Sequence, residues 1–214
     1  MATFINKVIK TMITSDFFLN LGWGFLSPVF AIFILEKISN TGPVQAAEIA
    51  GLSALFYWVP KSLFEIPIAI YLDNNKGEKD DFWAMIVGFF ILAAVPIGYL
   101  SSTTPWHIYL FQVIYALGMA MALPSWMAIF TRHIDKGREA FEWGMETSVI
   151  GMGAGIAGGL SGVLVALLGF NALFIFVSAF TLLSIVIMLF IRKHIFARDG
   201  HFVIFSGQKP IVEP

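Results

Sequence analysis

The sequence has no cysteine and few charged residues. Only 13% of its 214 residues are Asp, Glu, Lys or Arg, whereas a soluble domain carries about 25%. The lack of cysteine excludes disulfides, thiolate metal sites and cysteine nucleophiles. The net charge of −1 provides no basic surface of the kind that binds nucleic acid, so no nucleic-acid partner is expected.

Apolar residues fill most of the chain. They make up 58% of the sequence and include 22 Phe. Six apolar segments have the roughly 20-residue length that a membrane-spanning helix needs. They lie at about 16–37, 46–72, 82–100, 106–131, 143–168 and 172–191, with a tight turn at Gly169–Asn171 between the last two. The sequence therefore predicts an all-α membrane protein with six transmembrane helices.

These segments divide the chain into three parts. Residues 15–192 form the six-helix transmembrane domain, and residues 193–214 form a tail with a strand-like patch at His201–Phe205. Residues 1–14 form an N-terminal segment. Its residues 3–14 have one apolar face, which fits either an interfacial helix on the membrane surface or a simple extension of the first span. Both interpretations are open from the sequence.

The basic residues set an orientation. With six crossings, eleven of the thirteen Lys and Arg residues fall on one side of the membrane. Only Lys37 falls on the other side, and Lys61 lies within a span. Because basic loops stay in the cytoplasm, both termini are expected there, in a plasma-membrane protein.

The first and fourth segments repeat a pattern. Leu21-Gly22, Pro28 and Ala31-Ile32-Phe33 recur about 96 residues later as Leu117-Gly118, Pro124 and Ala128-Ile129-Phe130. The two segments run in opposite directions across the membrane. This predicts an inverted repeat of two three-helix units, an arrangement from which transporters build binding sites near the midplane. The alternative is chance, because these residue types are common in the chain.

Two opposite charges lie within the second segment. Lys61 and Glu65 are four residues apart, so they can pair on one helix. Ionisable groups inside a membrane are costly and often functional. We expect Glu65 to bind or exchange a proton or cation, with Lys61 setting its charge or holding an anionic substrate. The alternative is a structural pair that neutralises itself.

Other polar and aromatic residues are candidates for a binding cavity. The first segment contains Asp16 and Asn20, and the fourth contains Gln112 and Trp126. We expect the first and fourth helices to line the cavity. The histidines lack metal-site spacing, and no phosphate-binding loop is present. The sequence therefore predicts no metal and no cofactor.

The fifth segment is rich in glycine. Small residues four apart allow helices to approach closely, within the chain or between two copies. The interface candidates are Gly151, Gly155, Gly158, Gly159 and Gly162. The Gly159–Gly162 stretch also resembles the G-x-S-G pattern of intramembrane serine proteases at Ser161. That chemistry needs a neighbouring base, and the sixth segment offers no His until His194, on the opposite side, so no enzyme is expected.

Three stretches together resemble signatures of the major facilitator superfamily, over about residues 15–192. The loop after the second segment matches at Asp73 and Gly77, with one extra residue between them. In this loop Ala69 replaces a Gly and Asn74 an Arg. The fourth segment matches at Gly118 and Pro124, while Gln112 replaces an Arg and Ala116 a Gly. The fifth resembles an antiporter glycine pattern at Gly155–Gly159, shifted and without its Pro.

The resemblance implies a single six-helix half of such a transporter. The first and fourth helices would line the substrate path, and the second and fifth would form the interface between halves. Asp73, Gly77 and Lys79 would form a cytoplasmic gating loop, in which Asp73 caps a helix of the opposite half. The implied function is secondary transport of a small solute by alternating access, in contact with membrane lipids.

The resemblance leaves the second half open. The family normally has two halves in one chain, which leaves three alternatives. Two copies pair as a parallel homodimer, this chain is an accessory half, or it is a piece of a longer chain. A different class of function is a non-transporting scaffold or regulatory subunit, which would bind another membrane protein through its glycine-rich fifth helix.

Overall fold

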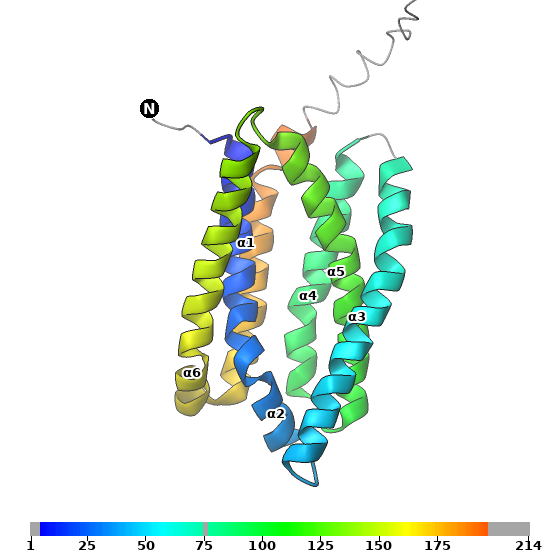
Figure 1. Cartoon of the computed structure of the whole chain (residues 1–214), viewed down its shortest axis with the longest axis vertical. Coiled ribbons are helices and arrows are strands. Elements are labelled where there is room, and N and C mark those ends of the chain that lie inside the picture. Colours follow the sequence, from blue (N-terminus) through cyan, green and yellow to red (C-terminus); the bar gives the residue numbers. More distant parts are fainter. Residues whose placement is uncertain (1–4, 75–76, 197–214) are drawn as a thin grey trace, which may run out of the picture.

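The protein is a bundle of long helices. The structure, a computed structural model, describes residues 5–74 and 77–196. Within these ranges the regular elements are α1 (Lys7–Leu26), the 3-10 turn η1 (Ser27–Val29), α2 (Phe30–Lys37), α3 (Pro43–Asn74), α4 (Lys79–Leu100), α5 (Pro105–His133) and α6 (Glu139–Leu189). Figure 1 shows the long helices running side by side. The predicted patch at His201–Phe205 and most of the tail lie outside the described residues.

Five helical runs of the described chain are long and apolar enough to cross a membrane. The last of them, α6, has 51 residues, so a straight helix would extend about 77 Å against a hydrocarbon core of about 30 Å. Instead the chain turns back at Gly169 (φ 76, ψ 172), a backbone conformation that is open almost only to glycine. Figure 1 shows the two arms, yellow and orange, running in opposite directions. The reversal lies inside the turn predicted at Gly169–Asn171.

The first helical run is continuous from Lys7 and bends at a proline. The Asn6 side chain caps α1 by accepting the Val8 N–H at 2.9 Å. No break occurs at residue 14, so residues 7–14 extend the first long helix, and a place for them on the membrane surface stays a prediction. Pro28 has no N–H to give to the helix, and the chain tightens there into η1 before continuing as α2.

The helices pack in two groups. In the first, α1 lies along α6, and the Ser15 hydroxyl donates to the Ser184 carbonyl at 2.8 Å. In the second, α5 packs against α3 and α4. The second arm of α6 joins the groups, because Ser178 donates to the Ala93 carbonyl of α4 at 2.8 Å. α1 and α5 themselves meet at few points, and the candidate site lies between them.

Candidate functional site

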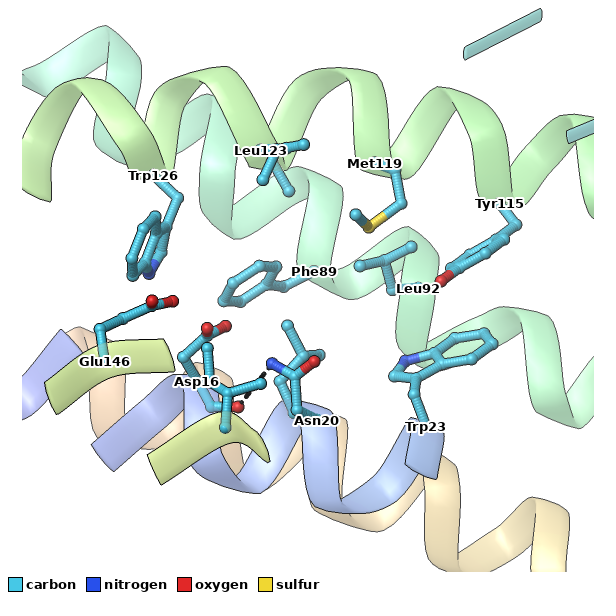
Figure 2. Close-up of a pocket in the computed structure, with 13 residues that line it drawn as sticks. Asp16, Asn20, Trp23, Phe89, Leu92, Tyr115, Met119, Leu123, Trp126 and Glu146 are labelled. Carbon is cyan, nitrogen blue, oxygen red and sulfur yellow. Dashed lines mark hydrogen bonds between the residues drawn. The ribbon is translucent and has the colours of Figure 1, made fainter. Parts of the chain in front are cut away.

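A cavity of about 260 Å³ lies between the two helix groups (Figure 2). α1 and α5 provide most of its wall, α4 provides its back, and the first arm of α6 (residues 139–168) completes it. The lining residues are Asp16, Leu19, Asn20, Trp23, Phe89, Leu92, Tyr115, Met119, Ala122, Leu123, Trp126, Glu146 and Ile150. Three predicted site residues, Asp16, Asn20 and Trp126, therefore share one cavity.

Two carboxyl groups face each other across this cavity. Asp16 projects from α1 and Glu146 from α6, and Figure 2 shows their oxygens turned toward each other. They are close enough to interact directly. Asn20, one turn after Asp16, donates its side-chain N–H to the Asp16 carbonyl at 2.9 Å, which fixes the amide beside the pair.

Aromatic rings line the cavity from both helix groups. Trp23 of α1 stacks on Tyr115 of α5, with ring centroids 4.3 Å apart. Tyr115 also stacks on Tyr57 of α3, at 4.7 Å. These stacked rings hold the two groups together at the point where α1 and α5 approach. The indole nitrogens of Trp23 and Trp126 are buried and have no hydrogen-bond partner among the described residues.

A second cavity of about 280 Å³ lies beyond the Trp23–Tyr115 stack. Both rings line it as well as the first cavity, so the stack forms the partition between the two. Its polar lining residues include Ser27, beside the Pro28 bend, and Gln112. The predicted cavity residue Gln112 is therefore separated from Asp16 and Asn20 by the aromatic partition.

The predicted pair of Lys61 and Glu65 forms on α3. The Lys61 ammonium lies 2.6 Å from the Glu65 carboxylate and 5.7 Å from the Trp58 ring centroid. Lys61 is only 6% exposed. Neither residue lines the two cavities described above. The structure thus confirms the pairing but does not bring it together with Asp16, Asn20 or Trp126.

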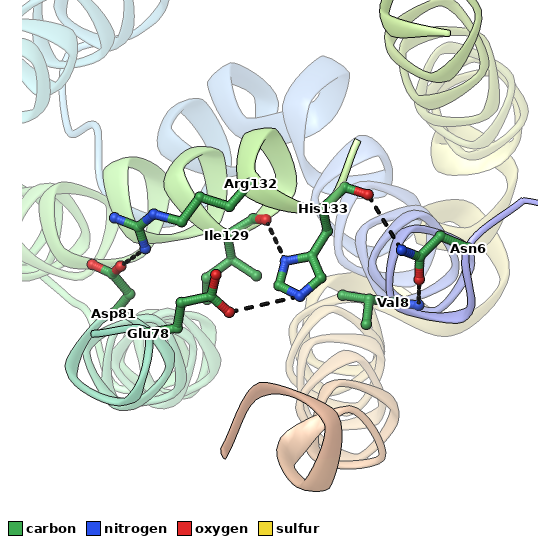
Figure 3. A network of polar contacts seen from close by, with 7 residues as sticks. All are labelled: Asn6, Val8, Glu78, Asp81, Ile129, Arg132 and His133. Carbon is green, nitrogen blue, oxygen red and sulfur yellow. Dashed lines mark hydrogen bonds and ion pairs between the residues drawn. The ribbon is translucent and has the colours of Figure 1, made fainter. Parts of the chain in front are cut away.

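A polar network ties α4 to α5 at the end of the bundle that carries the N-terminus (Figure 3). Asp81 pairs with Arg132, and the His133 Nε2 lies 3.6 Å from the Glu78 carboxylate. The His133 carbonyl accepts an N–H from Asn6 at 3.3 Å, which adds the start of α1. The network fixes three chain segments at this end.

The predicted gating loop borders this network. Asp73, at the end of α3, lines a groove with Asp81 and with Pro124 of α5. Gly77 and Lys79 follow it, and the Lys79 ammonium lies 5.5 Å from the Phe196 ring. Residues 75–76 of the loop lie outside the described ranges. A gating role for Asp73, Gly77 and Lys79 stays a prediction.

The fifth-segment glycines divide into two kinds. Gly158 faces η1, where an added Cβ would lie 3.5 Å from Pro28. An added Cβ would meet nothing within 4 Å at Gly151, Gly155, Gly159 and Gly162. Only one of the five predicted interface glycines therefore lies at a helix contact within the chain, and the other four line an open surface of α6.

Sequence reasoning missed Glu146 and the Glu78–Asp81–Arg132–His133 network. A signal for Glu146 existed, because it is an acidic residue inside an apolar segment, as Glu65 is. The network gave no comparable signal, because its members stand among other charged residues near predicted helix ends.

Ser161 has a structural contact in α6. Its hydroxyl donates to the Gly158 carbonyl at 2.8 Å. In the part of the chain that the structure describes, no group of three or more His, Asp or Glu side chains is arranged to hold a metal ion.

The family comparison agrees with the geometry. The family model described as Major Facilitator Superfamily matches residues 12–201. No curated protein matches the chain. Because the family match covers most of the 214 residues and the helices with their cavity lie within it, the chain belongs to the major facilitator superfamily, a family of membrane transporters.

Proposed function

We propose that this protein moves a small solute across the plasma membrane by alternating access, as a parallel homodimer. The observation that carries the proposal is the cavity between α1 and α5. It combines polar groups with aromatic walls and ends at the Trp23–Tyr115 partition. Rocking of one copy against the other would open this cavity to one side of the membrane and then to the other.

Six crossings in an inverted repeat account for the packing. The two arms of α6 supply the fifth and sixth crossings. Gly22 lies on α1, the first crossing, and packs against Val177 of the sixth crossing. Gly118 lies at the equivalent position of α5, the fourth crossing, and packs against Gly88 of α4, the third crossing. Equivalent glycines thus contact equivalent helices, which supports the 3+3 repeat over chance.

The exposed faces support pairing with a second copy. In the most apolar stretch of each helix, only 11% of the residues of α3 are buried, against 50% of those of α4. Large apolar side chains are exposed on α3 and on the first arm of α6, at Trp58, Val59, Leu63, Ile66, Ile70, Met152, Ile156, Leu160 and Val163. These are the second and fifth crossings, which the family resemblance assigns to the interface between halves. With both termini in the cytoplasm, two copies would pair in parallel.

A scaffold or regulatory subunit is the second candidate function. The open glycines of α6 favour it, because they would accept a helix of a different membrane protein as readily as a second copy. This function does not require solute to reach the cavity from both sides of the membrane.

Labelling of a single introduced cysteine separates the two functions. The chain has no native cysteine, so Asn20→Cys can be labelled in sealed vesicles with an impermeant thiol reagent added to one side at a time. Alternating access predicts labelling from either side, because the same residue meets each side in turn. Val44→Cys, at the start of α3 where the side chain is 83% exposed, should react from one side only and so controls for sealing. Labelling of Asn20→Cys from one side only would contradict alternating access.

A further inference from the structure

We propose that the cavity between Asp16 and Glu146 binds a small organic cation, a protonated amine attached to an aromatic ring that also carries a hydroxyl group. This inference rests on the proposed transport function, because it names the solute class that the cavity takes. It is carried by the charge of the lining, the chemistry of the walls and two unpartnered hydrogen-bond donors.

The charge of the lining favours a cation. The titratable groups that face the cavity are Asp16 from α1, Tyr115 from α5 and Glu146 from α6. α4 contributes only Phe89 and Leu92. None of the lining residues is Lys, Arg or His, so no basic partner within the cavity balances the two carboxyl groups. An anion would be repelled here, whereas an ammonium group between the two carboxyl groups would be attracted to both.

The walls favour an aromatic ligand. The rings of Trp23, Phe89, Tyr115 and Trp126 line the cavity from three helices. Ring faces attract cations and stack on other rings. The volume of about 260 Å³ is just below the roughly 300–1,000 Å³ of sites for drug-sized ligands. The cavity therefore suits a single-ring amine rather than a large one.

Two indole donors point to an acceptor on the ligand. Trp126 is 5% exposed, and its Nε1 has no hydrogen-bond partner among the described residues. Figure 2 shows this nitrogen directed into the cavity, on the side of Glu146. The Nε1 of Trp23 is also buried without a partner. A buried donor left unpaired is costly, so a ligand hydroxyl that accepts from either indole would recover that cost.

Tyramine is a direct probe, because it joins an ammonium group to a phenol. We would titrate it into the purified protein in detergent by isothermal titration calorimetry. Its neutral counterpart 4-propylphenol, in which a methyl group replaces the amine, has the same size and the same hydroxyl. The inference predicts saturable binding of tyramine and binding of 4-propylphenol that is weaker by about tenfold or more, since a charged partner is lost.

Variants locate the binding to this cavity. Asp16→Asn and Glu146→Gln should each weaken tyramine binding by about tenfold or more. Glu142→Gln is the matched control, because Glu142 is a buried carboxyl one turn away on α6 that does not line the cavity. It should bind tyramine as the native protein does. Gel filtration checks that each variant is folded, and the comparison of the two ligands on native protein decides the question even if a variant is not.

Three results would overturn the inference: no saturable binding at millimolar tyramine, equal binding of 4-propylphenol, or unchanged binding in both folded cavity variants. Binding needs no transport, so it is independent of the labelling of Asn20→Cys. Selective tyramine binding with one-sided labelling would refute transport and keep the site. Two-sided labelling without selective binding would refute the organic-cation site alone.

Discussion

At the scale of single residues, Lys61 and Glu65 bring two charges into α3, a helix long and apolar enough to span the membrane. The ammonium is almost fully buried, while 28% of the Glu65 side chain is exposed. Removing one partner of such a pair leaves the other charge uncompensated, which costs more than removing both. The pair therefore holds the charge of Lys61 in place, whether or not it also takes part in coupling.

This asymmetry predicts the behaviour of variants. Glu65→Gln should lower stability by about 3 kcal/mol, since it leaves the Lys61 ammonium buried without its partner. The double variant Lys61→Gln with Glu65→Gln should recover most of that loss. Thermal unfolding in detergent measures both, and Glu48→Gln, exposed on the same helix, should unfold as the native protein does. Equal melting of the single and double variants would contradict a charge-compensating pair.

Two pairs of charged residues show which contacts a sequence predicts and which it does not. Lys61 and Glu65 are four residues apart on one helix, so their contact follows from helix geometry alone. Asp16 and Glu146 are 130 residues apart in the sequence, and their contact depends on how α1 and α6 are rotated about their axes. No local pattern sets that rotation, so the sequence does not predict that Glu146 faces Asp16.

At the scale of helices, glycines decide which backbones come close. α4 and α5 cross at Gly88, where an added Cβ would lie 2.6 Å from the Gly118 carbonyl oxygen. α1 and α6 cross at Gly24, where it would lie 2.9 Å from the Ala154 backbone. The glycine spacing in the fifth segment predicts a helix interface, and four of those glycines line an open surface of α6. It did not reveal which side of the helix faces the bundle, and only Gly158 of the five predicted glycines does.

A pair of alanine substitutions tests this distinction. Gly88→Ala should destabilise the protein by about 1–3 kcal/mol, because the new methyl group forces two backbones apart. Gly155→Ala meets nothing within 4 Å and removes a poor helix former, so the stability of the single chain should stay equal or rise by up to about 1 kcal/mol. Thermal unfolding of the two variants compares them directly. A Gly88→Ala variant as stable as Gly155→Ala would show that the α4–α5 crossing is looser than described.

At the scale of the whole molecule, the membrane is what made the fold predictable. A spanning helix must be apolar over about 20 residues. For this reason the apolar segments of the sequence predict most ends of the long helices to within a few residues. The exception is the first helix, which begins at Lys7 rather than near residue 16, because residues 7–14 are amphipathic and gave two interpretations. The reversal at Gly169 was also predictable, since only a short turn separates two apolar runs.

The proposed transport function requires the assembly of two halves. α3 and the first arm of α6 lie on opposite sides of the bundle in Figure 1. In a parallel homodimer, the end of α3 in one copy would meet the start of α6 in the other. A cysteine at position 73 of one copy would then lie beside a cysteine at position 140 of the other, at the same depth. The native chain contains no cysteine to interfere.

The most direct measurement is the mass of the purified protein in lipid nanodiscs, combined with crosslinking of the Asp73→Cys, Ala140→Cys variant. A parallel homodimer predicts the mass of two chains and a crosslink between copies. A second variant, Ala140→Cys with Val44→Cys, controls for random contact and should not crosslink, because Val44 lies at the other end of α3. A strictly monomeric mass without a crosslink would contradict the homodimer and direct the search to a different partner for the second half.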